Sequence, residues 1–163
     1  MTAVRNEIQA MQNPALGAVL LWRFTCGYTP ESSPTGTPLP LAFLVLPLAF
    51  HARSLEKVLS TRPSSGMRML EEKFSDRTDV LLSVQSRMLA MRMLSLRSLR
   101  IAVRTGLLTL VSKDAVLWPR SRSAPPTAEA KGVGDLLKSA EKLGVWCRDI
   151  SLFEIAGLLK VEF

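Results

Sequence analysis

Residues 95–120 read SLRSLRIAVRTGLLTLVSKDAVLWPR and carry the clearest fold signal in the chain. The apolar residues Leu96, Leu99 and Val103 recur at helical spacing, and Gly106 marks the expected end of that helix. Two short apolar runs follow, joined by a polar pair, and this pattern predicts a β-hairpin. A helix followed by a hairpin has the outline of a helix and its wing, so the stretch predicts a winged-helix-like unit.

Most of the remaining chain shows helical signals. Asn13 is a good helix cap, Pro14 suits the first helical position, and Gly27 is expected to end that helix. Pro47 is expected to kink or divide the apolar segment 41–60. A further helix is predicted after Ser64 or Ser65, with Met67, Leu70 and Phe74 facing inward. Two more are predicted over residues 78–94, capped by Thr78, and over residues 95–105, capped by Ser95. The last two are predicted over residues 134–143, where Gly144 interrupts the helix, and after Ser151.

The pattern as a whole predicts a mainly α-helical fold with a small β element. Its 163 residues fit a single domain, 1–163, with a helical part over residues 1–94 and a winged-helix-like part over residues 95–163. Residues 28–40 are rich in proline and hydroxyl side chains and are expected to form a loop. The closing residues 161–163, VEF, alternate in polarity, so we expect them to add a third strand beside the hairpin.

The net charge of +7 is concentrated in one quarter of the chain. Residues 80–122 carry eight basic side chains and one acidic side chain, while the segments before and after them are nearly neutral. Such a cluster is typical of a surface that binds nucleic acid or an acidic protein, although a solvated helix face has the same composition. The candidate contact residues are Arg87, Arg92, Arg97, Arg100, Arg104, Lys113, Arg120 and Arg122.

The predicted helix before the hairpin has a basic face. The spacing of Arg97, Arg100 and Arg104 places three guanidinium groups side by side. Arginine suits phosphate because its planar fork donates two hydrogen bonds at once. This helix offers only arginine and serine to a groove and lacks the asparagine, glutamine and lysine that read bases well. We therefore expect any DNA contact to involve the backbone, with little sequence preference.

Three aromatic residues, Trp22, Phe24 and Tyr28, follow one another at the end of the first predicted helix. Two interpretations remain open for them. Large aromatic side chains on a buried helix usually belong to the core. Tryptophan and tyrosine beside an arginine, here Arg23, are also typical of an anchor at a protein interface.

Residues that carry chemistry are few and scattered. Cys26 and Cys147 cannot supply the four ligands that a structural zinc site needs. His51 has no acid or nucleophile patterned around it, so capping a helix or edging the core is its expected role. The carboxylates of residues 71–79 alternate with basic side chains, as on an exposed helix. We therefore expect no enzymatic activity, no metal and no cofactor.

Two apolar runs, residues 15–22 and 39–50, are shorter than the roughly 20 residues that a membrane helix requires. Both are therefore predicted to lie in the core, and no membrane association is expected. The start of the chain shows no signal peptide, and two cysteines suggest no disulfide framework. These features favour a cytoplasmic protein.

Three segments together resemble a known family. They are NPALGAVLLWRFTCGY (13–28), PLPLAFLVLPLAFHARSLEKVLSTRPSSGMRMLEEKF (38–74) and EKLGVWCRDISLFEIAGLLKVEF (141–163). In this order, and over nearly the whole chain, the sequence resembles the middle component of bacterial three-component ABC systems, which are similar to Lamassu-type antiphage defence.

The resemblance implies an accessory subunit without a reaction of its own. In such systems a small middle protein lies between an SMC-like or DNA-repair-type ABC ATPase and an effector, often a nuclease, and related small subunits behave like kleisins. The expected partners are therefore the ATPase, the effector and, within the complex, DNA. The family offers no motif that assigns roles to individual residues. An autonomous winged-helix DNA-binding regulator remains the alternative.

Overall fold

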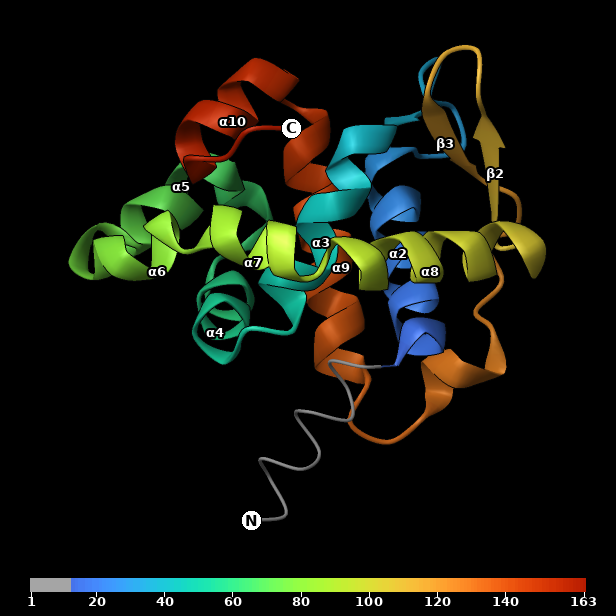
Figure 1. Ribbon diagram of the computed structural model, residues 1–163, viewed down its shortest axis with the longest axis horizontal. Helices are drawn as coiled ribbons and strands as arrows, with labels where there is room; N and C mark the ends of the chain where they lie inside the picture. Colours follow the sequence, from blue (N-terminus) through green and yellow to red (C-terminus); the bar gives the residue numbers. More distant parts are fainter. Residues whose placement is uncertain (1–12) are drawn as a thin grey trace.

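A computed structural model describes residues 13–163, and it is mainly helical, as predicted (Figure 1). The α-helices are α2 (Pro14–Tyr28), α3 (Ala42–Ala49), α4 (Ala52–Ser60), α5 (Gly66–Lys73), α6 (Thr78–Leu82), α7 (Val84–Ala90), α8 (Arg92–Arg104), α9 (Gly134–Arg148) and α10 (Leu152–Leu159). Short 3-10 turns are η1 (Leu39–Leu41), η2 (Pro63–Ser65), η3 (Ser75–Arg77) and η4 (Pro126–Glu129).

The predicted hairpin is present and belongs to a three-stranded antiparallel sheet of order β1-β3-β2. The strands are β1 (Thr37–Pro38), β2 (Leu108–Val111) and β3 (Val116–Pro119). The prediction that residues 161–163 add the third strand is wrong. This strand comes instead from the end of the proline-rich loop. Thr37 lies opposite Leu117, and the Leu39 amide donates a hydrogen bond of 2.9 Å to the Ala115 carbonyl. These backbone bonds satisfy the outer edge of β3.

Helices α2 and α9 form the centre of the fold and lie side by side. Asn13 caps α2 as predicted, but Gly27 does not end it. A Cβ on Gly27 would meet the Glu141 carbonyl oxygen of α9, and a Cβ on Gly144 would meet the Phe24 carbonyl oxygen of α2. Both glycines therefore serve close helix packing. The prediction that Gly144 interrupts its helix is wrong for the same reason, since α9 continues to Arg148.

Helix α3 lies within the core, and nearly all of its side chains are buried. Pro47 lies inside α3, and the predicted division of segment 41–60 comes three residues later, at Phe50. Because a proline has no backbone N–H, the helical turn before it lacks one hydrogen bond. This weaker turn favours a change of chain direction. The two arms, Leu39–Ala49 and Ala52–Ser60, meet at 102°.

No single helix among residues 13–163 is long and apolar enough to cross a membrane. The bent pair Leu39–Ala49 and Ala52–Ser60 reaches that length and apolarity only when its two arms are taken together.

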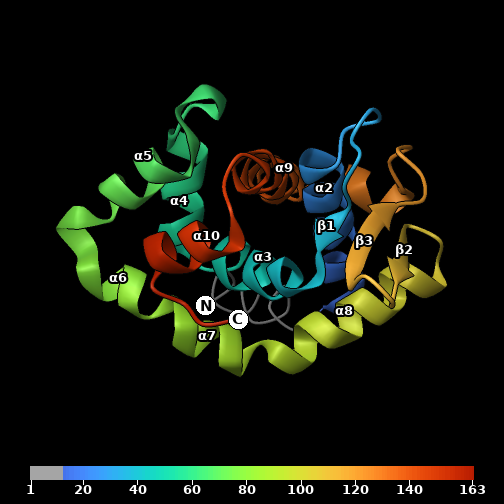
Figure 2. The ribbon, with the colours of Figure 1, turned by 90° about the horizontal axis from the view of Figure 1, so that it is seen from above.

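Helices α6, α7 and α8 form a curved band along one side of the molecule (Figure 2). The single helix predicted over residues 78–94 is wrong, because the chain bends at Ser83 and Met91. Helical hydrogen bonds cross both bends, so the band curves without breaking, and Val84 and Met88 stay buried against the core. Thr78 donates to the Ser75 carbonyl and does not cap a helix.

Two predictions near the ends of helices have opposite outcomes. Ser95 was predicted to cap a helix, but it lies inside α8 and is 2% exposed, because the helix begins earlier, at Arg92. Ser151 does cap α10, in a capping box: the Ser151 hydroxyl accepts a hydrogen bond from the Glu154 backbone N–H, and the Glu154 carboxylate accepts one from the Ser151 backbone N–H. Gly106 ends α8 as predicted, with φ of +78°.

Candidate functional site

Helix α8 packs on α2 through small side chains, and this packing decides which residues face solvent. Ser98 and Ala102 are fully buried. A Cβ on Gly17 of α2 would overlap the Ser98 hydroxyl, so the glycine allows the two helices to approach closely. With the small residues inward, Arg97 and Arg100 are exposed on the outer side of α8.

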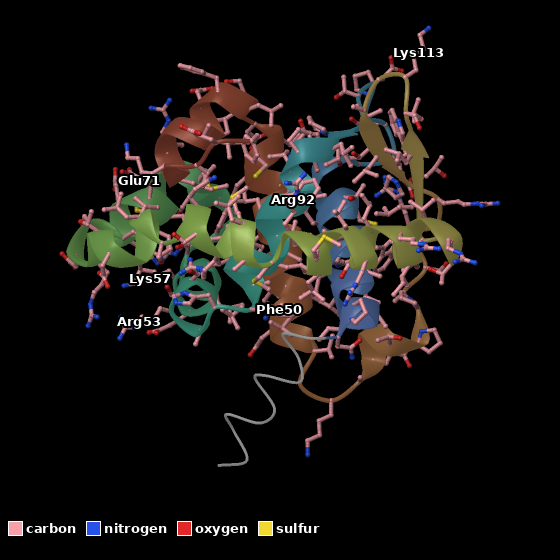
Figure 3. The ribbon with its side chains drawn as sticks, in the orientation of Figure 1. Phe50, Arg53, Lys57, Glu71, Arg92 and Lys113 are labelled. Carbon is pink, nitrogen blue, oxygen red and sulfur yellow. The ribbon has the colours of Figure 1, made fainter. Side chains whose placement is uncertain are left out.

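Six of the eight basic residues predicted for a contact surface are exposed, and their side chains form no hydrogen bond within residues 13–163. They are Arg92, Arg97, Arg100 and Arg104 on α8, Lys113 in the hairpin turn, and Arg120 directly after β3. Within residues 13–163 none of these six forms an ion pair. The structure brings the α8 arginines onto one helix, whereas Lys113 extends from the hairpin tip, away from α8 (Figure 3).

The other two predicted contact residues are engaged within the protein. Arg87 donates to the hydroxyls of Ser83, at 2.7 Å, and Ser54, at 3.2 Å, so it links α7 to α4. Burial lowers the pKa of the Arg87 guanidinium. Arg122 donates to the carbonyls of Cys26 and Thr29, which ties the segment after β3 to the end of α2. Both side chains hold the fold together.

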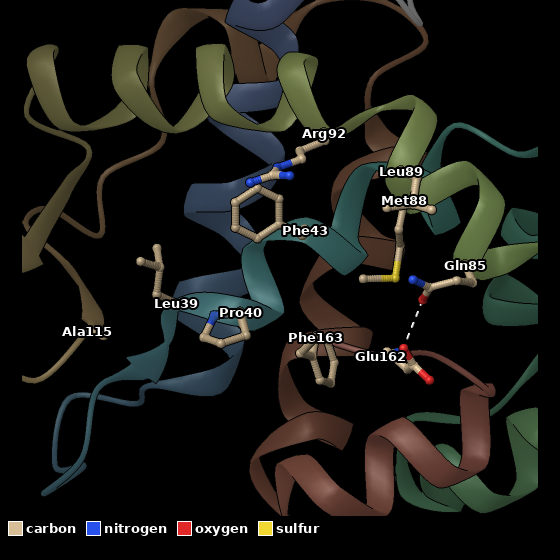
Figure 4. A pocket seen from close by; sticks show the side chains of 10 residues that line it. All are labelled: Leu39, Pro40, Phe43, Gln85, Met88, Leu89, Arg92, Ala115, Glu162 and Phe163. Atoms are coloured by element: carbon tan, nitrogen blue, oxygen red, sulfur yellow. Dashed lines mark hydrogen bonds between the residues drawn. The ribbon is translucent and has the colours of Figure 1, made fainter.

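A mostly apolar pocket of about 400 Å³ opens beside α7 and the start of α8 (Figure 4). Helix α7 contributes Gln85, Met88 and Leu89. The segment before and within α3 contributes Leu39, Pro40 and Phe43, and the remaining lining residues are Arg92, Ala115, Glu162 and Phe163. The Glu162 amide donates to the Gln85 side-chain oxygen at 2.9 Å, which anchors the chain end to α7. A site of this size and polarity suits an apolar group better than a charged one.

Apolar side chains continue from the pocket along the outer side of α7 and α8. Leu89 is 64% exposed, Met93 60% and Leu96 38%. Phe163, at the pocket rim, is 46% exposed. Single exposed apolar residues are common, whereas several of them beside an apolar pocket are typical of an interaction surface. We call this set, Leu89, Met93, Leu96 and Phe163, the apolar row.

The aromatic residues near the end of α2 lie mostly inside the protein. Trp22 and Phe24 are each 1% exposed, and Tyr28 is partly buried. The Trp22 indole N–H donates to the Ser121 carbonyl at 2.6 Å. Neither the Trp22 ring nor the Phe24 ring reaches the surface.

The cysteines have the chemistry of buried thiols. Burial raises the pKa of Cys26 to about 11, although Arg122 and Arg23 oppose the shift. Complete burial raises the pKa of Cys147 as well. Both thiols therefore stay protonated near neutral pH and are poor nucleophiles and metal ligands. Among residues 13–163 no group of three or more His, Cys, Asp or Glu side chains is placed to hold a metal ion.

The only histidine in the sequence, His51, caps α4, which agrees with one of its two predicted roles. Its ring Nδ1 accepts a hydrogen bond from the Ser54 backbone N–H at 3.3 Å and lies 2.9 Å from the Ser54 hydroxyl oxygen. Burial lowers the pKa of His51, and the positive charges of Arg87 and Arg53 lower it further. Protonation would remove the acceptor and add a third positive charge.

This cap predicts a pH dependence of stability. The folded chain binds the His51 proton less readily than the unfolded chain, so the free energy of unfolding falls as the pH drops below the ordinary value of 6.5. We expect His51→Asn to keep the cap and to lose this part of the dependence, because asparagine caps well and does not titrate. Urea denaturation at about pH 7.5 and about pH 5.5 measures it. An equal loss of stability in both proteins would contradict the assignment.

Comparison with known proteins gives one match. The family model of the ABC-three component (ABC-3C) system Middle Component 3 matches residues 1–163, the whole length of the chain. The chain belongs to this family. No curated protein and no solved structure matches it.

Membership in the Middle Component 3 family confirms the predicted middle component of an ABC three-component system. A middle component has an accessory role and works with partners in an assembly of several components. The exposed surface of α7 and α8 therefore belongs to a protein that functions within a complex.

Sequence reasoning identified the basic face of α8 but missed the pocket. Its walls come from four segments far apart in the chain: residues 39–43, residues 85–92, Ala115 and residues 162–163. Leu89 and Met93 gave a weak signal, because they fall outside the helical repeat of Leu81, Val84 and Met88, whose side chains are buried. The exposure of Leu89 and Met93 could not be derived from the sequence, because the bends at Ser83 and Met91 were not predicted.

Proposed function

We propose that this Middle Component 3 protein is a non-catalytic adaptor of a Lamassu-like antiphage system. It bridges an SMC-like or DNA-repair-type ABC ATPase and an effector, a nuclease. The observation that carries the proposal is the outer surface of α7 and α8, where the apolar row adjoins unpaired arginines within the described residues 13–163. Exposed apolar side chains in this arrangement are expected on a subunit that a partner covers.

The arginines also support a contact with nucleic acid within the complex. Arg97, Arg100 and Arg104 extend the outer side of α8 beyond the apolar row. Guanidinium groups bind phosphates without reading bases, so such a contact would depend strongly on salt and little on sequence. DNA held by the ATPase would meet this end of α8 while a protein segment covers the other end.

Co-expression with the proteins encoded beside it tests the adaptor role. We expect the tagged chain to co-purify with the ABC ATPase and the effector in one assembly, and to show no nuclease or ATPase activity when purified alone. If the chain forms no complex with the neighbouring ATPase, the adaptor proposal fails.

Charge reversal on α8 tests the role of the arginines. We expect Arg97→Glu/Arg100→Glu/Arg104→Glu to weaken binding of the assembled complex to duplex DNA by about tenfold or more, because three phosphate contacts become repulsive. Fluorescence anisotropy at two salt concentrations measures the affinity. The matched control is Arg53→Glu/Arg62→Glu/Arg77→Glu, which changes the net charge equally at exposed positions outside α8. Equal effects of the two triple variants would contradict a specific role for α8.

An autonomous DNA-binding regulator is the second candidate. It is favoured by α8 followed directly by the β2–β3 hairpin, which is the order of a recognition helix and a wing. This candidate predicts that the isolated chain binds one DNA sequence in the presence of excess competitor DNA. Loss of binding upon competition would exclude it.

A further inference from the structure

We infer that the pocket beside α7 binds an acidic amphipathic helix of another component of the system, and this inference rests on the proposed adaptor function. The helix would insert one large apolar side chain into the pocket and lay its apolar face along the apolar row. Its acidic side chains would face Arg92 at the start of α8. The shape, the exposure and the charge of the surface all favour this occupant.

The shape suits a single anchoring side chain. The pocket of about 400 Å³ has a largely apolar wall, with Phe43 from α3, Met88 from α7 and Phe163 from the chain end. Each wall residue comes from a different element, so the chamber is formed by the fold and does not require a partner to assemble. A leucine or aromatic side chain placed here would lose contact with water on most sides, which is the usual environment of an interface hot spot.

The exposed residues extend the pocket in one direction. Leu89, Met93 and Leu96 are separated by four and three residues, which places them on one side of α7 and α8. Seven residues of helix cover about 10 Å, or two turns of a partner helix lying alongside. An amphipathic helix presents apolar side chains at the same repeat, so its face matches the row.

The charges select an acidic partner. Residues 80–113 contain no aspartate or glutamate, and Arg92, at the start of α8, lines the pocket. Glu162 is the one acidic residue in the pocket lining. Figure 4 shows Arg92 and Glu162 on opposite sides of the pocket. A partner helix with carboxylates toward Arg92 and a neutral or basic side chain toward Glu162 would complement both ends.

Photocrosslinking within the assembled complex tests the occupant. A benzoylphenylalanine introduced at position 93 in place of Met93 would react with whatever covers the row, and the crosslinked peptide is identified by mass spectrometry. We expect a helical segment of the ATPase or the effector that carries carboxylates beside its apolar face. The same probe at Phe153, which is 87% exposed on α10, serves as the control and is expected not to capture this segment. Crosslinks to a second copy of this chain, to its own residues or to DNA would overturn the inference.

Affinity provides the second arm. We expect Leu89→Asp/Met93→Asp to weaken binding to the crosslinked component by about tenfold or more, since two carboxylates would be buried against apolar and acidic groups. Leu82→Asp, at another exposed leucine of the curved band, is the control and is expected to change binding less than about threefold. If the complex forms and the double variant binds normally, this inference fails while the adaptor role stands. If no complex forms with the wild-type chain, both fail.

Discussion

We expect Gly144→Ala to lower the free energy of unfolding of this protein by about 3 kcal/mol, the upper end of the usual range for overpacked sites. The new Cβ would overlap the Phe24 carbonyl oxygen and lie 2.9 Å from the Tyr28 backbone nitrogen. Both obstacles belong to the backbone of α2, so no side-chain rotation relieves the clash. Helices α2 and α9 would have to move apart along the centre of the fold. Urea denaturation followed by circular dichroism measures the loss.

Gly157→Ala is the matched control for this variant. Gly157 lies inside α10, is exposed, and has no other atom within 4 Å of an added Cβ. The same chemical change should therefore stabilise the chain by up to about 1 kcal/mol through helix propensity alone. If both alanine variants change the free energy of unfolding by the same amount, the predicted contribution of close packing at Gly144 to stability is wrong.

The second large effect is expected at Trp22. Trp22→Ala removes a side chain that is 1% exposed together with its 2.6 Å hydrogen bond to the Ser121 carbonyl. Replacing a buried aromatic residue with alanine usually costs about 3–5 kcal/mol, because it leaves a cavity. Loss of the indole N–H also removes one of the hydrogen bonds that hold the segment after β3 to α2, while those of Arg122 remain. Thermal denaturation and the amide exchange of residues 120–123 measure the two consequences.

Phe153→Ala is the control for Trp22→Ala, and the two variants together test whether Trp22 has a core role or an interface role. Phe153 is 87% exposed, so its removal is expected to change the free energy of unfolding by less than about 0.5 kcal/mol. A Trp22→Ala variant that folds with normal stability but no longer joins the complex would support the interface alternative and contradict the core assignment. The comparison thus decides between the two interpretations that the sequence left open.

Several local signals in the sequence predicted local structure correctly, although the caps predicted at Thr78 and Ser95 were wrong. The cap at Asn13, the capping box at Ser151 and the stop at Gly106 each depend on a few neighbouring residues, and all three agree with the structure. Gly27 and Gly144 were misinterpreted because a glycine that ends a helix and a glycine that admits a neighbouring helix look the same in a sequence. Only the contact between α2 and α9 distinguishes these roles.

Long-range features could not be predicted in the same way. The third strand pairs Thr37–Pro38 with β3, which is nearly eighty residues away, and two residues give too short a pattern to recognise. The pocket depends on four such distant segments. Charge, by contrast, was predictable, because an arginine on a helix seldom becomes buried and the basic cluster lies within one short region of the chain. Arg87, buried between α7 and α4, is the exception.

The small residues between α2 and α8 have a mechanical consequence. Gly17, Ser98 and Ala102 have no long side chains that could slide past one another, so α8 cannot shift on α2 without direct steric overlap. A force applied to the outer side of α8 therefore passes directly to α2, and through the glycine contacts to α9. If the chain acts as the adaptor proposed above, a partner that displaces α8 would therefore move α2 and α9 with it as one rigid body.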